Sequence, residues 1–134
     1  MARPRMEHPT PAELEVLQVL WDAGELTVRE VMSVLEETRG DQRAYTSVMS
    51  LLNVMTDKGL LRRRPQGRAF VYAARAPQDK TLGEMVGDLW QRAFDGSTSS
   101  LVTHLLSQAS PSEEELAAIR QAIAAYESDR EEQP

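Results

Sequence analysis

The sequence predicts a mainly α-helical chain with one small β-hairpin. Three observations predict it. Apolar residues recur at helical spacing in three segments within residues 10–57, and two short β-like runs follow within residues 60–74. Further helical stripes occupy residues 82–126. Three helices followed by a hairpin are the layout of a winged helix-turn-helix. The predicted architecture is therefore a winged helix-turn-helix DNA-binding domain (residues 1–76) followed by a C-terminal helical dimerisation domain (residues 77–134).

The first two helices are predicted from their start signals. Thr10-Pro11-Ala12-Glu13 has the pattern of a capping box with proline at the first helical position, so a helix should begin there. Gly24 should end it. Thr27-Val28-Arg29-Glu30 repeats the capping pattern and should begin the second helix. Trp21 and the leucines of the first helix should face a core.

The third predicted helix lies at the centre of the stretch RAYTSVMSLLNVMTDKGLLRRRPQGRAFVY, residues 43–72. Its apolar stripe is Val48, Leu51, Leu52 and Met55, and its opposite face carries Thr46, Ser47, Ser50 and Asn53. Gly59 can take the left-handed conformation that ends a helix. A helix with small, neutral hydrogen-bonding side chains on one face suits insertion into a DNA major groove.

A basic hairpin is predicted directly after this helix. Its strands are expected at Leu60–Arg64 and Ala69–Ala74, joined by the turn Pro65–Arg68. Strand alternation places Arg62 and Arg64 on one face and Arg63 on the other. The whole chain has a formal charge of −6, but residues 39–75 carry eight basic side chains and two acidic ones. A local cationic surface of this kind predicts contact with phosphate.

The polar helix face and the basic hairpin predict seven candidate contacts to double-stranded operator DNA. Hydroxyl groups can donate or accept at base edges, and arginines that neutralise phosphates release counterions. For the hydroxyls the alternative is plain solvent exposure or helix capping. For the arginines it is a solvated strand edge that discourages aggregation. The candidates are Arg43, Thr46, Ser47, Ser50, Arg62, Arg64 and Arg68.

The C-terminal part is acidic and is predicted to be helical. Asp95-Gly96-Ser97 should interrupt its helices, and Ser110-Pro111-Ser112-Glu113 reads as a third capping box. Fewer than sixty residues in three helices cannot easily enclose a core, so their apolar stripes predict a homodimer. Packing against the N-terminal domain is the alternative. The candidate dimerisation residues are Leu82, Met85, Val86, Leu89, Trp90, Phe94, Leu101, Leu105, Ile119 and Ile123.

Composition argues against several other classes of protein. The chain has no cysteine, which excludes disulfides, thiolate metal sites and thiol catalysis. No Gly-rich phosphate loop, histidine-based triad or HExxH pattern is present, so no enzyme is predicted. His8 and His104 are the only histidines, and zinc needs three or four ligands, so neither a metal nor another cofactor is expected. With no apolar run near ~20 residues and no signal peptide, a cytoplasmic protein without membrane insertion is expected.

Three segments carry a family resemblance: LEVLQVLWDAGELTVREV, AYTSVMSLLNVMTDKGLL and GRAFVYAA. Through them the chain resembles the penicillinase-repressor (BlaI/MecI/CopY-type) family of winged-helix transcriptional regulators, over about residues 9–127. SLVTHLLS and SPSEEELAAIRQAI match more weakly. The resemblance implies a dimeric repressor of inverted-repeat operators that controls β-lactam resistance or another stress response. A winged-helix protein-interaction module and a small-molecule-sensing regulator are the alternatives.

The chain departs from the family pattern at its regulatory positions. In the β-lactam branch, a membrane receptor metalloprotease leads to cleavage at an Asn-Phe pair. The matching positions are His104 and Leu105, which become the candidate proteolytic switch. The copper-sensing branch uses paired C-terminal cysteines, which this chain lacks. Val54 stands where the family often carries a basic residue. The resemblance therefore leaves the mechanism of release open.

Overall fold

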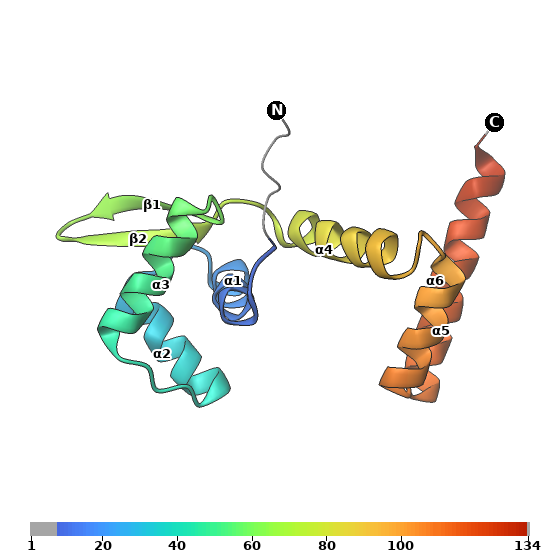
Figure 1. The fold of residues 1–134 in the computed structure, drawn as a ribbon, viewed down its shortest axis with the longest axis horizontal. Coiled ribbons are helices and arrows are strands. Elements are labelled where there is room, and N and C mark those ends of the chain that lie inside the picture. Colours follow the sequence, from blue (N-terminus) through green and yellow to red (C-terminus); the bar gives the residue numbers. More distant parts are fainter. Residues whose placement is uncertain (1–7, 134) are drawn as a thin grey trace. The chain divides into compact units, whose positions relative to one another are not determined.

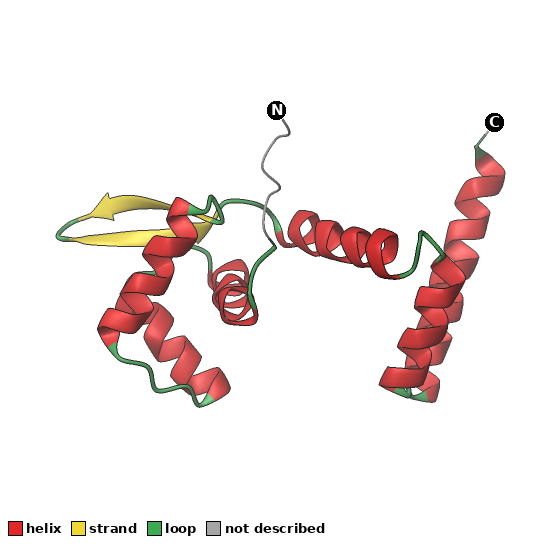
Figure 2. Cartoon of the chain, viewed as in Figure 1, coloured by secondary structure: helices red, strands yellow, loops and turns green. Residues whose placement is uncertain are grey.

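The computed structural model describes residues 8–133 and has, within them, six helices and one antiparallel hairpin (Figures 1 and 2). The predicted mainly helical fold class with a hairpin wing is confirmed. Residues 1–7 of the predicted N-terminal domain and Pro134 lie outside the described part. The elements are α1 (Pro11–Ala23), α2 (Val28–Arg39), α3 (Tyr45–Asp57), β1 (Leu61–Gln66), β2 (Ala69–Ala74), α4 (Gln78–Ala93), α5 (Thr98–Ala109) and α6 (Glu113–Glu132).

The two predicted capping boxes at the starts of α1 and α2 are confirmed. Thr10 Oγ1 accepts from the Glu13 backbone N–H at 3.2 Å, and a Glu13 carboxylate oxygen accepts from the Thr10 N–H at 2.9 Å. Thr27 and Glu30 form the same pair of bonds at 3.2 and 2.9 Å. Both boxes satisfy backbone donors that would otherwise lack partners at a helix start. Gly24, with a φ of 88°, follows α1.

The core of the N-terminal part lies between α1, α2, α3 and the base of the hairpin. Its central side chains are at most 2% exposed, and they come from the three helices and from both strands of the hairpin. The connection between α1 and α2 joins the hairpin as well: Leu26 pairs with Tyr72 through backbone bonds of 3.0 and 2.8 Å. The hairpin base is thus held to the helices by both packing and backbone bonds. The central core residues are Val16, Leu17, Leu20, Val31, Leu35, Val48, Leu52, Met55, Leu61 and Tyr72.

The hairpin is longer than predicted and its turn is tighter. Leu61 pairs with Ala74 and Gln66 with Ala69, so only Gly67 and Arg68 form the turn. The prediction of a four-residue turn beginning at Pro65 was therefore wrong. Proline is tolerated in a strand at a sheet edge, where its missing N–H can face solvent, and β1 has a neighbour on one side only. Gly67, with a φ of 62°, supplies the left-handed residue that the turn needs.

The chain divides into two compact units that meet between Val86 and Gly87, within α4. The start of α4 belongs to the N-terminal unit. There the Trp21 indole N–H donates to the Ala76 carbonyl at 3.0 Å, and Gln78 donates to Gln18 at 3.3 Å. The functional boundary between residues 76 and 77 remains a prediction.

The helices α4, α5 and α6 bury none of their side chains. The break between α4 and α5 falls at residues 94–97, one residue earlier than the predicted Asp95-Gly96-Ser97, with Asp95 at a φ of 49° and Gly96 at 74°. The predicted capping box at Ser110 was wrong. Ser110 ends α5 in the left-handed conformation, and Ser112 caps α6 by accepting from the Glu115 N–H at 3.2 Å. The S-x-x-E pattern occurs twice here, two residues apart, and α6 begins after the second serine.

No helix among residues 8–133 combines the length and the apolar character that crossing a membrane requires.

Candidate nucleic-acid interface

The exposed face of α3 carries the hydroxyl groups that were predicted to read DNA. Thr46, Ser47 and Ser50 are exposed, while the apolar stripe on the other side of the helix anchors it in the core. Val54 is 50% exposed and lies at helical spacing from Ser47 and Ser50, so the face continues with an apolar group. Such a surface offers donors, acceptors and a methyl contact without charge, which is the chemistry of base edges in the major groove.

The N-terminus of α3 lacks the side-chain cap that α1 and α2 have. Its N-cap residue is Ala44, which forms no side-chain cap bond, and the first turn contains no acidic residue. The first backbone N–H groups of a helix have no partner inside it, and the helix dipole makes this end positive. The start of α3 is therefore suited to an anion such as a phosphate. Arg43, just before the helix, pairs with Asp41 at 2.6 Å.

Arg64 of the hairpin has an acidic partner in the connection between α1 and α2. Its Nε and Nη2 atoms donate to the two carboxylate oxygens of Glu25 at 2.7 and 3.1 Å. The hydrogen bond from Arg64 lowers the pKa of the Glu25 carboxyl, and the same bond raises the pKa of Arg64. A DNA phosphate would have to compete with Glu25 for this arginine.

Arg63 ties the hairpin to α3. Its Nη1 atom donates to Asn53 Oδ1 at 3.0 Å, and its guanidinium lies 4.5 Å from the centre of the Phe70 ring. The Tyr72 hydroxyl donates to the same Asn53 oxygen at 3.0 Å. Asn53 was predicted on the DNA-facing side of α3, and that prediction was wrong, because its oxygen accepts two bonds from the hairpin. Arg63 and Arg64 bond to different elements, as the predicted strand alternation requires.

Arg62 and Arg68 are the other two predicted arginines of the hairpin. Arg62 is exposed on β1 and lies close enough to Glu25 to help lower the pKa of that carboxyl. Arg68 is exposed in the turn and forms no ion pair with any residue in the described range 8–133. Of the candidate cations in the hairpin, Arg68 is thus placed for contact with an outside anion without losing an acidic partner.

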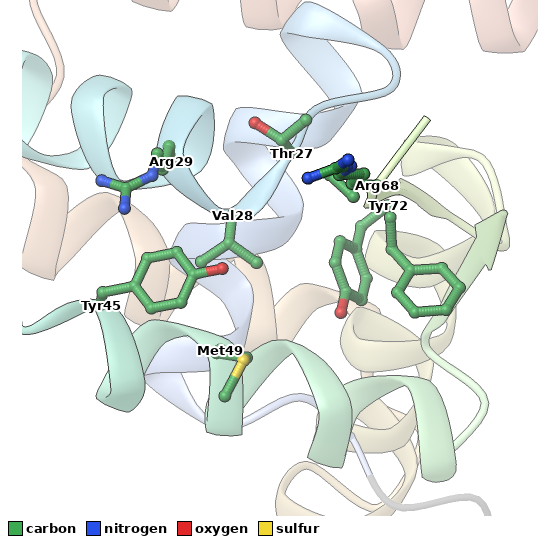
Figure 3. Close-up of a pocket in the computed structure, with 9 residues that line it drawn as sticks. Thr27, Val28, Arg29, Tyr45, Met49, Arg68 and Tyr72 are labelled. Carbon is green, nitrogen blue, oxygen red and sulfur yellow. The ribbon is translucent and has the colours of Figure 1, made fainter. Parts of the chain in front are cut away.

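A hollow of about 370 Å³ opens between α2, the first turns of α3 and the hairpin (Figure 3). We call it the α2–α3–hairpin hollow. Arg29 stands on one side of it, 5.0 Å from the centre of the Tyr45 ring, and Arg68 on the other side. Its lining residues are Thr27, Val28, Arg29, Tyr45, Met49, Arg68, Ala69, Phe70 and Tyr72. The sequence did not single out Arg29, because a cation inside a capping box reads as an ordinary exposed helix residue.

In this chain a helical core anchors an exposed polar helix, and a cationic hairpin follows that helix. Comparison with known proteins identifies the family to which the chain belongs. The family profile described as Penicillinase repressor matches residues 9–125. The chain belongs to the penicillinase repressor family. Members of the family are transcriptional repressors with a DNA-binding domain and not enzymes, so this chain is a BlaI-type transcriptional repressor.

Relatives of this repressor match it over most of its length. The Penicillinase repressor of Bacillus licheniformis is 25% identical over 121 residues, which cover 90% of this chain and 93% of that one. The Transcriptional regulator BlaI of Mycobacterium tuberculosis is 32% identical over 124 residues, covering 91% and 87%. The crystal structure of the YusO protein from Bacillus subtilis matches with a TM-score of 0.53 at 20% identity, over 90% and 75% of the two chains. That last similarity shows a shared fold alone.

The predicted dimerisation residues lie on α4, α5 and α6, except Phe94, which directly follows α4. Val86, Leu89, Leu105 and Ile123 are each about half exposed or more, at 55%, 48%, 60% and 53%. The others are half-buried or, like Ile119, at the border of exposure. Exposed apolar side chains on three successive helices are typical of a surface that another protein covers.

The candidate switch residues His104 and Leu105 lie inside α5. The His104 ring contacts the Phe94 ring edge to face, with centres 5.1 Å apart, and its Nδ1 atom is 3.0 Å from the Ser100 carbonyl oxygen. Among residues 8–133, no three His, Cys, Asp or Glu side chains are grouped so that they could hold a metal ion.

Proposed function

We propose that this repressor acts as a homodimer on inverted-repeat operators in double-stranded DNA. One observation carries the proposal: an exposed, uncharged hydroxyl face on α3 stands beside a hairpin whose Arg68 has no acidic partner in the described range. In this account α3 enters the major groove, where Thr46, Ser47 and Ser50 meet base edges. The hairpin lies on the flanking backbone as the wing.

The arginines take different parts in this proposal. Arg62 and Arg68 contact phosphate directly, because each is exposed at the hairpin surface. Arg43 and Arg64 contact phosphate only by exchanging an acidic partner, Asp41 or Glu25, for the DNA. The gain in charge pairing is therefore smaller for these two, and their contribution to binding should be smaller than that of Arg68.

The exposure of apolar side chains on the C-terminal helices supports the proposed homodimer. Their side chains are never fully buried within one chain, although they carry many large apolar groups. A symmetric second copy would cover them, because symmetric dimers are the commonest oligomers. A two-fold symmetric protein in turn reads a two-fold symmetric site, with half-sites one helical turn or a multiple of it apart.

The relatives also suggest which response this chain controls and how it is released from DNA, and both are proposals. One relative is named a penicillinase repressor, and we propose that this chain controls β-lactam resistance or another stress response. Release by a membrane receptor metalloprotease would use the bond between His104 and Leu105. That bond is inside α5, so local unwinding of the helix would have to precede cleavage.

Two variants test the proposed DNA contacts. Duplexes are first selected from a random library by the full-length chain, and binding is then measured to a selected and to a scrambled duplex at several salt concentrations. Arg68→Ala should weaken binding to both and lower the salt slope by about 2 for a dimer, since each phosphate contact contributes about 0.9. Ser47→Ala should change the ratio between the two duplexes instead. Arg130→Ala, which removes the same charge from α6, serves as the control. If Arg68→Ala binds like the unaltered chain, the proposed wing contact is wrong.

A further inference from the structure

The α2–α3–hairpin hollow is positively charged in an otherwise acidic protein. None of its nine lining residues is acidic, and two of them are arginines, whereas the chain as a whole has a formal charge of −6. Neither Arg29 nor Arg68 forms an ion pair with any residue in the part of the chain that the structure describes. The carboxylate of Glu30, the residue after Arg29 in the sequence, accepts the Thr27 N–H in the capping box. The hollow therefore favours an anion.

The floor of the hollow is apolar. Val28 and Tyr72 are buried beneath it, and Met49 and Phe70 add further apolar surface. Figure 3 shows the Thr27 hydroxyl between the two arginines and the Tyr45 hydroxyl group directed across the hollow. A compact inorganic anion would leave this floor uncovered. A sugar-phosphate chain would not, because it carries charge at its phosphates and an apolar face on each deoxyribose.

We infer that this hollow seats one strand of the DNA backbone, with Arg29 and Arg68 holding its phosphates and a deoxyribose on the apolar floor. The inference rests on the proposed DNA binding and adds a contact to it. It assigns Arg29 of α2 as a second clamp residue opposite the wing. The backbone strand would then bridge α2 and the hairpin beside the start of the recognition helix, which fixes the depth at which α3 enters the groove.

Tyr45 acts as a positioning residue in this arrangement. Its ring lies 5.0 Å from the Arg29 guanidinium carbon, within the range of a cation–π contact. The contact orients Arg29 without neutralising it, whereas a carboxylate partner would compete with phosphate. Tyr45 is the first residue of α3, so this contact also couples the position of Arg29 to the recognition helix.

The first test replaces Arg29 by glutamine in the full chain. Arg29→Gln should lower affinity about tenfold for both a selected and a random duplex, as expected for loss of a charge-assisted bond at an exposed site. The salt slope should fall by about 2 per dimer. Arg130→Gln should change neither quantity, whereas Tyr45→Leu, which removes the ring that orients Arg29, should weaken binding to both duplexes. Arg29 is exposed, so thermal unfolding of the variant should stay unchanged. Wild-type affinity and slope in Arg29→Gln would overturn the inference.

The second test locates the contact on the DNA. Single phosphates of the selected duplex are replaced, one position at a time and symmetrically, by neutral methylphosphonate. The unaltered chain should lose affinity at a small set of positions in each half-site, and Arg29→Gln should be insensitive at one of them. If Arg29→Gln loses as much affinity as the unaltered chain at every replaced phosphate, Arg29 contacts no phosphate and the inference fails. The proposed DNA binding would not be affected by that result. If the unaltered chain binds neither duplex, the proposed function fails first.

Discussion

At the scale of single residues, Glu13 is the one charged side chain buried in the described core, at 3% exposure. Burial by itself raises the pKa of its carboxyl. Hydrogen bonds from the Thr10 backbone N–H and from the Lys58 ammonium group outweigh burial, so the pKa lies below its ordinary value. The Lys58 Nζ atom donates to both carboxylate oxygens at 2.9 and 3.0 Å. Glu13 thereby joins the start of α1 to the residue that caps the end of α3.

Replacing Glu13 by glutamine should destabilise the fold by about 1–3 kcal/mol at pH 7, because a buried charge-assisted bond is lost. A carboxyl whose pKa is lowered by folding contributes stability above its unfolded pKa of about 4.3, and this contribution is lost as the pH falls through the folded pKa. The difference in free energy of unfolding between Glu13→Gln and the unaltered chain should therefore be smaller at pH 3 than at pH 7. Urea unfolding at both pH values measures it, with Glu37→Gln on exposed α2 surface as the control. A gap that is absent at pH 7, or that widens in acid, would contradict this role.

The ion pair between Glu25 and Arg64 predicts a gain of DNA affinity on mutation. Glu25→Gln removes the acidic partner that holds Arg64 and deletes a negative charge beside Arg62. Binding to selected and scrambled duplexes should both strengthen, and the salt slope should steepen by up to about 2 per dimer. Anisotropy titrations over a range of salt measure both effects, and Glu37→Gln makes the same charge change elsewhere. Weaker binding by Glu25→Gln would show that the carboxylate positions the hairpin for DNA instead.

At the scale of elements, Asn53 is the joint between the recognition helix and the wing. It accepts one bond from Arg63 and one from Tyr72, and both donors belong to the hairpin. Asn53→Ala leaves the buried Tyr72 hydroxyl without this acceptor and should destabilise the fold by about 1–3 kcal/mol. Tyr72→Phe removes the donor together with its need for a partner and should cost less. Chemical unfolding of the two variants makes the comparison, and equal stability of Asn53→Ala and the unaltered chain would rule out this joint.

The element boundaries show what local sequence can predict. Capping boxes at Thr10 and Thr27 predicted the starts of α1 and α2 because the pattern is complete within four residues. The turn after β1 was predicted too long, because strand pairing across Pro65 is decided by the partner strand and not by local preference. Two serines with the same S-x-x-E spacing compete to cap α6, and the structure uses the second, which the local pattern alone does not decide.

The residues of the candidate interface also fall into those that the local sequence predicted and those that it could not predict. Periodicity predicted the exposed hydroxyls of α3, since they lie on the face of the helix opposite the buried stripe. The partners of the arginines could not be predicted from the sequence. Arg64 meets Glu25 from a position 39 residues away, and Arg29 meets Tyr45 across the connection between α2 and α3. Only the tertiary fold brings these side chains together, so the spacing of residues along the sequence cannot predict these contacts.

At the level of the whole molecule, two copies of the chain are proposed to bind one operator. Leu105 is 60% exposed on α5, and an aspartate there would place a charge in the proposed dimer interface. Leu105→Asp should shift the chain toward monomer, and it should weaken binding to a full inverted repeat far more than binding to a half-site, because the second contact is no longer linked to the first. Sedimentation equilibrium and gel shifts measure the two effects. Gln108→Asp, on an exposed polar position of the same helix, should leave both unchanged.

We propose that α3 and its wing, present once in each of two chains, read a symmetric operator together. Selection from a random duplex library by the full-length chain, followed by sedimentation of the complex with the enriched duplex, tests this proposal. We expect an inverted repeat with half-sites centred about 10 bp, or a multiple of that, apart and two chains bound per duplex. Enrichment of no sequence, or one chain bound to an asymmetric site, would contradict it.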